Sequence, residues 1–267
     1  VWGCRSVPVT GRKQVLLVPE SQEIAMGETA YQEILQEQPL SKDARAAAVV
    51  ERVGRRIAAV ADRPDYQWEF RVLASDVPNA FCLPGGKVAF YEGILPICQN
   101  EAGVAAVMSH EIAHALARHG GERISQGLIA QAVGQVIRLG LGEKDDVERE
   151  RILWAYGIVS QYGVILPYSR KHEAEADAIG LKLMARAGYD PTEAVRFWER
   201  FAAAAAGPRP PEFLSTHPSD ERRAEALRRL LPEALELYAQ AETQFGLGER
   251  LLADETRLAG HQRESTR

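Results

Sequence analysis

The chain has 267 residues, of which 46% are hydrophobic and 26% are charged, and its net charge is −5. This composition is typical of a folded globular protein and excludes a disordered chain. The acidic balance and the absence of a basic stripe argue against nucleic acid as a partner. The best candidate for a membrane span, residues 127–142, is interrupted by polar side chains. No segment of the sequence is therefore expected to span a bilayer, which excludes a membrane-embedded enzyme.

The hydrophobic pattern predicts an α+β fold. Amphipathic helices are expected over residues 18–38 and 41–62, and a strand over residues 68–73 follows. Residues 79–83 and 87–91 form a predicted hairpin around a Pro-Gly-Gly turn. From residue 100 onward the pattern is almost entirely helical. We therefore expect a small sheet within a mostly helical body.

The segment between residues 121 and 167 is long for a connection and mostly helical in pattern. Its apolar residues could form a lid over a cleft, but an ordinary core is the favoured interpretation. These residues are Leu128, Ile129, Val133, Val136, Ile137 and Leu139. We expect an N-terminal anchor or linker over residues 1–19, a main domain over residues 20–245 and a charged tail over residues 246–267.

One predicted helix, running from Glu101 to about Gly121, is apolar on nearly every side, as is typical inside a core. It nevertheless carries His110, Glu111 and His114. Without partners, each buried neutral polar group would cost about 1–3 kcal/mol. Residues four apart share a helix face, so both imidazoles can point at one ion, with Glu111 turned by about 100° beside it. This His-Glu-x-x-His pattern predicts two zinc ligands and a general base.

A catalytic zinc site also needs a third protein ligand and an open position. The best candidate is Glu173, in a helical stretch where Ala176 and Gly180 would permit close helix packing. Asp177, one turn further on, could accept a hydrogen bond from the far ring nitrogen of a ligand histidine. The alternatives are a surface pair of Glu173 and Asp177 and, for the motif itself, two ordinary core histidines.

The combination His110-Glu-Ile-Ala-His114 with Glu173-x-x-x-Asp177 resembles the gluzincin metallopeptidases. Other strings resemble, more narrowly, the soluble relatives of HtpX and the CAAX prenyl proteases. They are Asn79-Ala-Phe, Pro84-Gly-Gly-Lys, Ser169-Arg, Glu175-Ala-Asp and Thr216-His-Pro. Two further strings resemble the opening of the envelope-lipoprotein branch of that family, Val7-Pro-Val-Thr-Gly-Arg-Lys-Gln14 and Leu17-Val-Pro-Glu20. The resemblance implies a zincin-like fold that binds one Zn²⁺ through His110, His114 and Glu173.

The resemblance also assigns roles to residues with weaker signals. It implies that Asn79, Ala80 and Phe81 lie on an edge strand that flanks the cleft and binds extended substrate, although an ordinary internal strand is the alternative. It further implies a catalytic His217, which donates to the oxyanion, and a substrate-binding Arg223. His217 could instead be a fourth zinc ligand that keeps the enzyme latent, or part of a loop that leads into a helix.

The remaining polar candidates are expected to lie outside the site. Glu175 should be a solvated charge on the far side of its helix, and Cys82 and Cys98 either form a disulfide or stay as buried thiols. Three further histidines should be structural or solvent-exposed. They are His119, His172 and His261.

The N-terminal string Val1-Trp-Gly-Cys4 resembles the end of a bacterial lipoprotein signal, where a lipid is attached to the cysteine. The alternative is an incidental cysteine in a flexible terminus. With the lipoprotein-branch resemblance, this string predicts a protein of the bacterial periplasm that associates with a membrane through a lipid on Cys4.

The sequence as a whole predicts a zinc-dependent endopeptidase. Glu111 would take a proton from the attacking water and deliver it to the leaving nitrogen. Protein or peptide substrates are expected, including misfolded envelope proteins. Two rival hypotheses are a zinc-bearing chaperone or assembly factor with minor proteolysis, and a structural metal site with four protein ligands.

Overall fold

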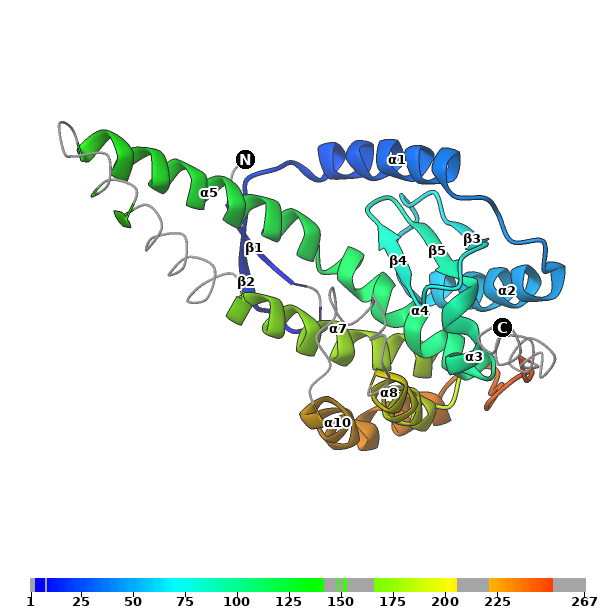
Figure 1. The fold of residues 1–267 in the computed structure, drawn as a ribbon. Helices are drawn as coiled ribbons and strands as arrows, with labels where there is room; N and C mark the ends of the chain where they lie inside the picture. The colour runs from blue at the N-terminus through cyan, green and yellow to red at the C-terminus, as the bar shows by residue number, and fades with distance from the viewer. Residues whose placement is uncertain are drawn as a thin grey trace.

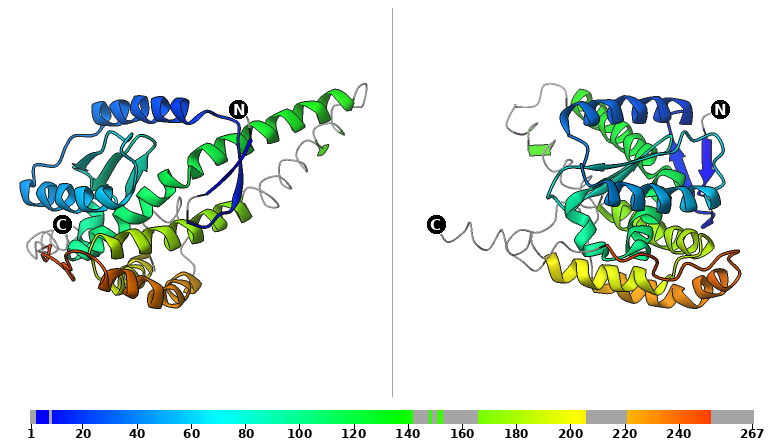
Figure 2. Two further views of the ribbon diagram at one scale, coloured as in Figure 1. Left: turned by 180° about the vertical axis from the view of Figure 1, so that it is seen from behind. Right: turned by 90° about the vertical axis from the view of Figure 1, so that its right-hand side faces the viewer.

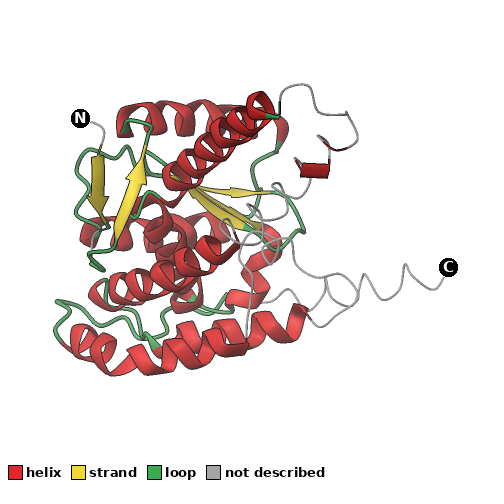
Figure 3. Cartoon of the chain, turned by 90° about the vertical axis from the view of Figure 1, so that its left-hand side faces the viewer, coloured by secondary structure: helices red, strands yellow, loops and turns green. Residues whose placement is uncertain are grey.

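The computed structural model describes residues 3–7, 9–141, 148, 151–152, 166–205 and 221–251. Helices make up most of this structure, and two small sheets accompany them (Figures 1 and 3). The predicted α+β class is therefore confirmed. Within the described part of the chain, no helix has the length and apolar character that a membrane span requires.

The larger sheet consists of β3 (Glu69–Leu73), β4 (Ala80–Leu83) and β5 (Lys87–Tyr91), in the order β3-β5-β4. β5 runs parallel to β3 and antiparallel to β4, so the predicted β4–β5 hairpin is confirmed. Side chains alternate between the two faces of a sheet, and those of Phe70 and Phe90 enter the hydrophobic core.

Three helices enclose this sheet (Figure 1). α1 (Glu20–Glu37) covers one face, and α2 (Ala44–Val60) and α4 (Glu101–Leu116) cover the other. α2 begins at Asp43, whose carboxylate accepts hydrogen bonds from the amides of Arg45 and Ala46. Its buried face, with Val49, Val53 and Ile57 fully enclosed, is the predicted apolar stripe.

α4 lies between the sheet and a second group of helices, which Figure 2 shows from two sides. This group comprises α7 (Leu166–Arg186), α8 (Thr192–Ala205) and α10 (Glu221–Ala239). α7 and α8 both pack on α4, and α10 packs on α7 and α8. The short helices η1 (Glu92–Ile94) and α3 (Leu95–Cys98) connect β5 to α4. α4 is consequently buried on almost every side.

The predicted single helix from Glu101 to about Gly121 is wrong, because α4 ends at Leu116. Arg118 then adopts a left-handed conformation with φ 54°, and α5 (His119–Gly140) begins in a new direction. No glycine stops the helix. Instead, buried contacts hold the left-handed Arg118: its guanidinium donates to Glu23 on α1 at 2.6 Å and to the carbonyl of Val18 at 3.1 Å.

The distal part of α5 extends away from the body of the molecule (Figures 1 and 2). The favoured interpretation of its apolar residues as core is wrong, because Val136 and Leu139 are 69% and 81% exposed. Leu128, Ile129 and Val133 are also exposed. Helical periodicity alone cannot distinguish a stripe that faces a core from one that does not.

Two peripheral segments are attached to the main body. β1 (Gly3–Ser6) and β2 (Lys13–Leu16) form an antiparallel hairpin whose second strand contacts α5. Near the other end of the chain, the amides of Glu101 and Ala102 donate to the carbonyls of Glu249 and Leu247, at 2.9 and 3.1 Å. Residues 247–249 therefore satisfy the first N–H groups of α4. The three-part domain division remains a prediction.

Candidate metal centre

α4 supplies the two histidines of the motif. Asn100 caps its N-terminus, accepting a hydrogen bond from the amide of Gly103 at 2.8 Å. His110 and His114 follow on one face, and their Nε2 atoms lie 3.1 Å apart. His110 is buried, and His114 is nearly so. Local helix geometry and the enclosing helices thus fix both imidazoles.

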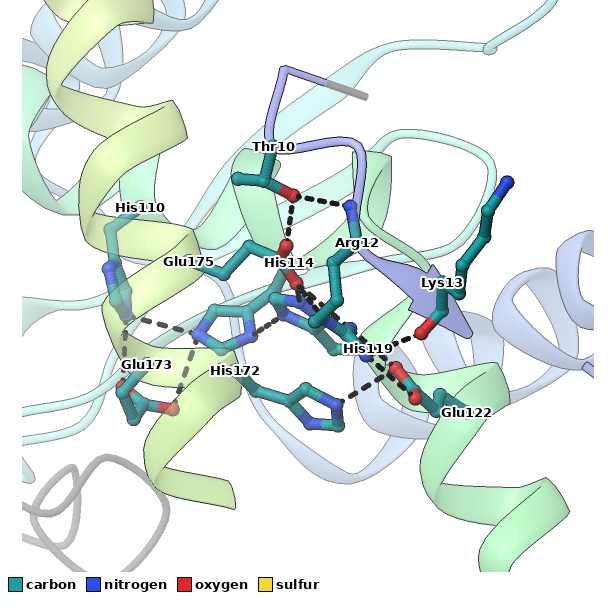
Figure 4. Close-up of polar contacts among 10 residues, drawn as sticks. All are labelled: Thr10, Arg12, Lys13, His110, His114, His119, Glu122, His172, Glu173 and Glu175. Atoms are coloured by element: carbon teal, nitrogen blue, oxygen red, sulfur yellow. Dashed lines mark hydrogen bonds and ion pairs between the residues drawn. The ribbon is translucent and has the colours of Figure 1, made fainter. Parts of the chain in front are cut away.

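α7 brings Glu173 to the same point. It crosses α4 so closely that a Cβ atom on Gly180 would lie 3.0 Å from the backbone nitrogen of His110. This approach places Oε2 of Glu173 3.3 Å from Nε2 of His110, and Oε1 3.4 Å from Nε2 of His114 (Figure 4). The Glu173 side chain is buried, so it is not part of an exposed surface pair.

The spacing of these donors fits a zinc ion. Ligands bonded at about 2.0–2.1 Å in a tetrahedron lie about 3.3 Å from one another. The three donor–donor distances, between 3.1 and 3.4 Å, match this value. His110, His114 and Glu173 also form a group whose ligand atoms all lie within 4.8 Å of one another. Imidazole and carboxylate are ligands that zinc commonly accepts, so the residues present fit the metal.

Asp177 lies one turn beyond Glu173 and contacts the other side of His110. Its Oδ1 is 3.0 Å from Nδ1 of His110, which fixes that nitrogen as the donor and leaves Nε2 for a metal. Burial alone would raise the pKa of Asp177, but Arg223 and His110 hold it at about 2. Asp177 is therefore an ionised acceptor at neutral pH.

Arg223, from α10, lies beneath this group and is itself buried. It donates to both oxygens of Asp177 at 2.6 and 2.8 Å, and its Nη1 is 3.2 Å from Oε2 of Glu173. Its guanidinium also stacks on the ring of Trp198, 3.6 Å from the centroid. Arg223 thus holds the two carboxylates in place. Its predicted contact with substrate remains a prediction.

Glu111 is buried next to His110 on α4, the helix that packs against β4. Its charge is near enough to β4 that, after burial itself, it raises the pKa of the Cys82 thiol. It also interacts electrostatically with Arg223. Glu111 is therefore close both to the candidate metal ligand next to it and to β4. Cys82 and Cys98 are both free thiols.

β4 is one of the two edge strands of its sheet among the described residues. The amide of Tyr91 donates to the carbonyl of Asn79 at 3.0 Å. Because bonded pairs alternate along an antiparallel ladder, the backbone groups of Phe81 also face β5, whereas those of Ala80 and Cys82 face the open edge. The Asn79 side chain accepts from the Ala80 amide at 2.9 Å.

Three residues that were predicted to lie outside the site are buried beside it. His119 is 1% exposed, and its Nδ1 lies 2.9 Å from Nδ1 of His114. Glu175 is not a solvated charge, since it contacts His119 and Arg12. His172 stacks on His119 and lies 3.0 Å from Glu122. α5 and the β1–β2 turn cover α7 at Glu175, so the prediction of a solvated Glu175 is wrong. The two buried histidines agree with the structural alternative of the prediction made for them.

Other predicted residues lie outside the described part of the chain. His217 and the Thr216-His-Pro string fall within residues 206–220, and His261 falls within residues 252–267. The three interpretations of His217 therefore remain predictions.

Comparison with known proteins identifies the family. The model of peptidase family M48 matches residues 44–231, well over half of the chain. The chain belongs to peptidase family M48. The mitochondrial metalloendopeptidase OMA1 of Schizosaccharomyces pombe is 39% identical over 232 residues, covering 85% of this chain and 66% of that protein. OMA1 of Saccharomyces cerevisiae is 34% identical, covering 88% and 71%. The predicted class, a zinc metallopeptidase, is thereby confirmed.

The comparisons also correct the predicted compartment. The OMA1 relatives are mitochondrial by name and come from fungi, animals and plants, which contradicts a bacterial periplasmic location. A more distant M48 relative is the beta-barrel assembly-enhancing protease of Escherichia coli, 27% identical over 85% of this chain and 47% of that protein. The envelope-lipoprotein branch is therefore not supported. The signal-like string at Cys4 is too short to outweigh similarity along most of the chain.

Proposed function

We propose that this M48 member is a zinc-dependent endopeptidase that cleaves unfolded or extended segments of proteins. The observation that carries the proposal is the tetrahedral spacing of His110, His114 and Glu173 beside Glu111. The names of the relatives, metalloendopeptidase and protease, support the same reaction class. His110, His114 and Glu173 would hold the ion. When bound, zinc supplies a Lewis acid that polarises a carbonyl and lowers the pKa of water toward neutrality.

Glu111 acts as the general base. It follows His110 directly on α4, so its carboxylate is displaced from the ligand face and stays available for proton transfer. It would take a proton from the attacking water and then deliver it to the leaving amine nitrogen. Because Glu111 is next to His110 and its charge acts on Cys82 of β4, a substrate that followed this strand would bring its carbonyl close to Glu111.

β4 supplies the substrate platform. The backbone groups of Ala80 and Cys82 point away from β5, so an extended peptide can add to the sheet as a further strand. Such pairing uses main-chain hydrogen bonds and therefore requires an unfolded segment, with little dependence on its sequence. The Asn79 side chain, which now accepts from the Ala80 amide, would yield that position to the substrate.

The decisive experiment replaces Glu111 by Gln and measures both zinc binding and cleavage of unfolded casein. We expect zinc binding to persist and the rate of cleavage to fall by about 10²–10⁴-fold, the usual contribution of a general base. Glu193→Gln is a matched control, because Glu193 is equally buried but pairs with Arg200 on α8. It should lower stability and leave cleavage by the folded protein unchanged. Undiminished cleavage by the Glu111 variant would refute the proposal.

A further inference from the structure

A series of short side-chain contacts leads from the candidate metal centre to the N-terminal hairpin (Figure 4). Nδ1 of His114 lies 2.9 Å from Nδ1 of His119, and Nε2 of His119 lies 3.0 Å from Oε2 of Glu175. Glu175 in turn accepts hydrogen bonds from Nε of Arg12, at 2.9 Å, and from the hydroxyl of Thr10. Four separate segments thus meet here: α4, α5, α7 and the β1–β2 turn.

His114 at one end of this series of contacts and Glu175 at the other determine which ring nitrogens carry protons. If Nε2 of His114 binds a metal, Nδ1 of the same ring carries the proton and donates to His119. His119 must then accept at Nδ1 and carry its own proton on Nε2, which donates to Glu175. Every donor meets an acceptor when both imidazoles are neutral and Glu175 is ionised. The contacts therefore select the tautomer of His114 that presents Nε2 to the ion.

We infer that the turn between β1 and β2 is a structural part of the metal centre, in which Thr10 and Arg12 position His114 through Glu175 and His119. The inference rests on the proposed zinc site and deepens it. Thr10, Arg12, Glu175 and His119 are positioning residues, because none of them reaches the point where a substrate would react. Thr10 and Arg12 precede residue 44, where the match to the M48 family model begins.

Arg12 holds His119 by a second route as well. Its Nη1 and Nη2 atoms donate to the two oxygens of Glu122, at 2.9 and 2.7 Å. Glu122 is also 3.0 Å from Nε2 of His172, whose ring stacks on that of His119 with centroids 4.2 Å apart. One guanidinium consequently supports the His119 ring at its edge, through Glu175, and over its face, through His172.

The electrostatics make Arg12 necessary to this arrangement. The side chains of Glu122 and Glu175 are 3% and 5% exposed, and in the described part of the chain Arg12, which is 22% exposed, pairs with both. Removal of the Arg12 guanidinium would leave the buried carboxylates of Glu122 and Glu175 without this positive charge. We expect both carboxylates then to move toward water or toward other hydrogen-bond donors. Either movement would release His119 from its position against His114.

The inference is tested by titrating Zn²⁺ against a competing chelator in the full chain and in variants. His119→Ala should weaken zinc binding by about 10–100-fold, the usual effect of losing the partner of a ligand histidine. Arg12→Ala, two contacts further from the ion than His119, should weaken it by roughly 10-fold. Arg12→Lys keeps the positive charge but loses the paired N–H donors of the guanidinium. The zinc dissociation constant of this variant should therefore lie between those of Arg12→Ala and the wild type. With Co²⁺ in place of Zn²⁺, the visible absorption bands should shift in the same variants.

Arg200→Ala is the matched control. Arg200 is also 22% exposed and pairs with a buried glutamate, Glu193, but it lies at the opposite end of α4, where it donates to the carbonyl of Cys98. It should lower stability and leave zinc affinity and the Co²⁺ bands unchanged. Equal zinc affinity in the wild type, Arg12→Ala and Arg200→Ala would overturn the inference. If Arg12→Ala does not fold, unaltered affinity and Co²⁺ bands in Arg12→Lys would overturn it. A wild-type chain that binds no zinc would instead overturn the proposed function.

Discussion

The close crossing of α4 and α7 at Gly180 predicts a variant that affects metal binding more than folding. An alanine at this position would place its Cβ 3.0 Å from the nitrogen and 3.1 Å from the Cα of His110. Both atoms belong to the backbone of a buried helix, so neither can rotate away. Ordinary contacts begin near 3.4 Å, and the helices must therefore separate locally by about 0.4 Å.

Two energies oppose each other in Gly180→Ala. Alanine stabilises a helix relative to glycine by about 1 kcal/mol. Overpacking a dense core costs about 1–3 kcal/mol. The net loss of stability should therefore be only about 0–2 kcal/mol. The metal centre is less tolerant, because zinc–ligand distances vary by only about 0.2 Å. A displacement of 0.4 Å carries Glu173 away from the two histidines, and zinc affinity should fall about 10-fold.

The assay combines urea unfolding of the metal-free protein with zinc titration against a chelator. Gly127→Ala on α5 is the matched control, because no heavy atom lies within 4 Å of its Cβ position. It should gain up to about 1 kcal/mol and bind zinc like the wild type. If Gly180→Ala also gained stability and kept full zinc affinity, the helix crossing would not be what fixes Glu173.

Two further predictions concern buried charges. Arg223→Ala leaves Asp177 and Glu173 without this cation and should lower the free energy of unfolding, measured in urea, by about 3–5 kcal/mol. Arg223→Lys should have an intermediate stability. Wild-type stability of the alanine variant would contradict this prediction. Burial raises the pKa of Glu122, but His172 and Arg12 lower it to about 2, below the ordinary value of 4.5. Its stabilising effect should be complete above about pH 4.5 and disappear as the pH falls toward 2. The difference in unfolding free energy between the wild type and Glu122→Gln, both metal-free, should shrink over that interval, and a constant difference would contradict the assignment.

Much of the fold could be predicted because local patterns dominate it. The β4–β5 hairpin has a Pro-Gly-Gly turn, and the α2 stripe has an uninterrupted helical period. The spacing of His110 and His114 also required only the geometry of one helix. Glu173 lies about sixty residues further along the sequence. Its contact with the two histidines could be predicted because buried imidazoles require a polar partner. The resemblance to a known family pointed to the same residue.

The rest depended on tertiary contacts that leave little trace in a single sequence. The break at Arg118 is stabilised by Glu23, nearly a hundred residues earlier, and no local breaker marks it. His119 lies next to His114 only because the chain turns there. One signal was available in α7, where His172 and Glu175 stand beside Glu173. Both side chains point away from the ligand face of α7, so they would need polar partners if other segments covered that face. Only the structure shows that α5 and the β1–β2 turn cover it.

The positions of Asp177 and Glu175 show why the register of α7 matters. Asp177 contacts His110 directly, and Glu175, turned about 200° from Glu173, contacts His114 through His119. A single helix therefore supplies one candidate ligand and the carboxylates that orient the other two. Arg223 and Arg12 neutralise these carboxylates from opposite sides of α7. A shift of α7 along α4 would disturb all three candidate ligands together, so zinc binding and the docking of α7 should be lost in one cooperative step.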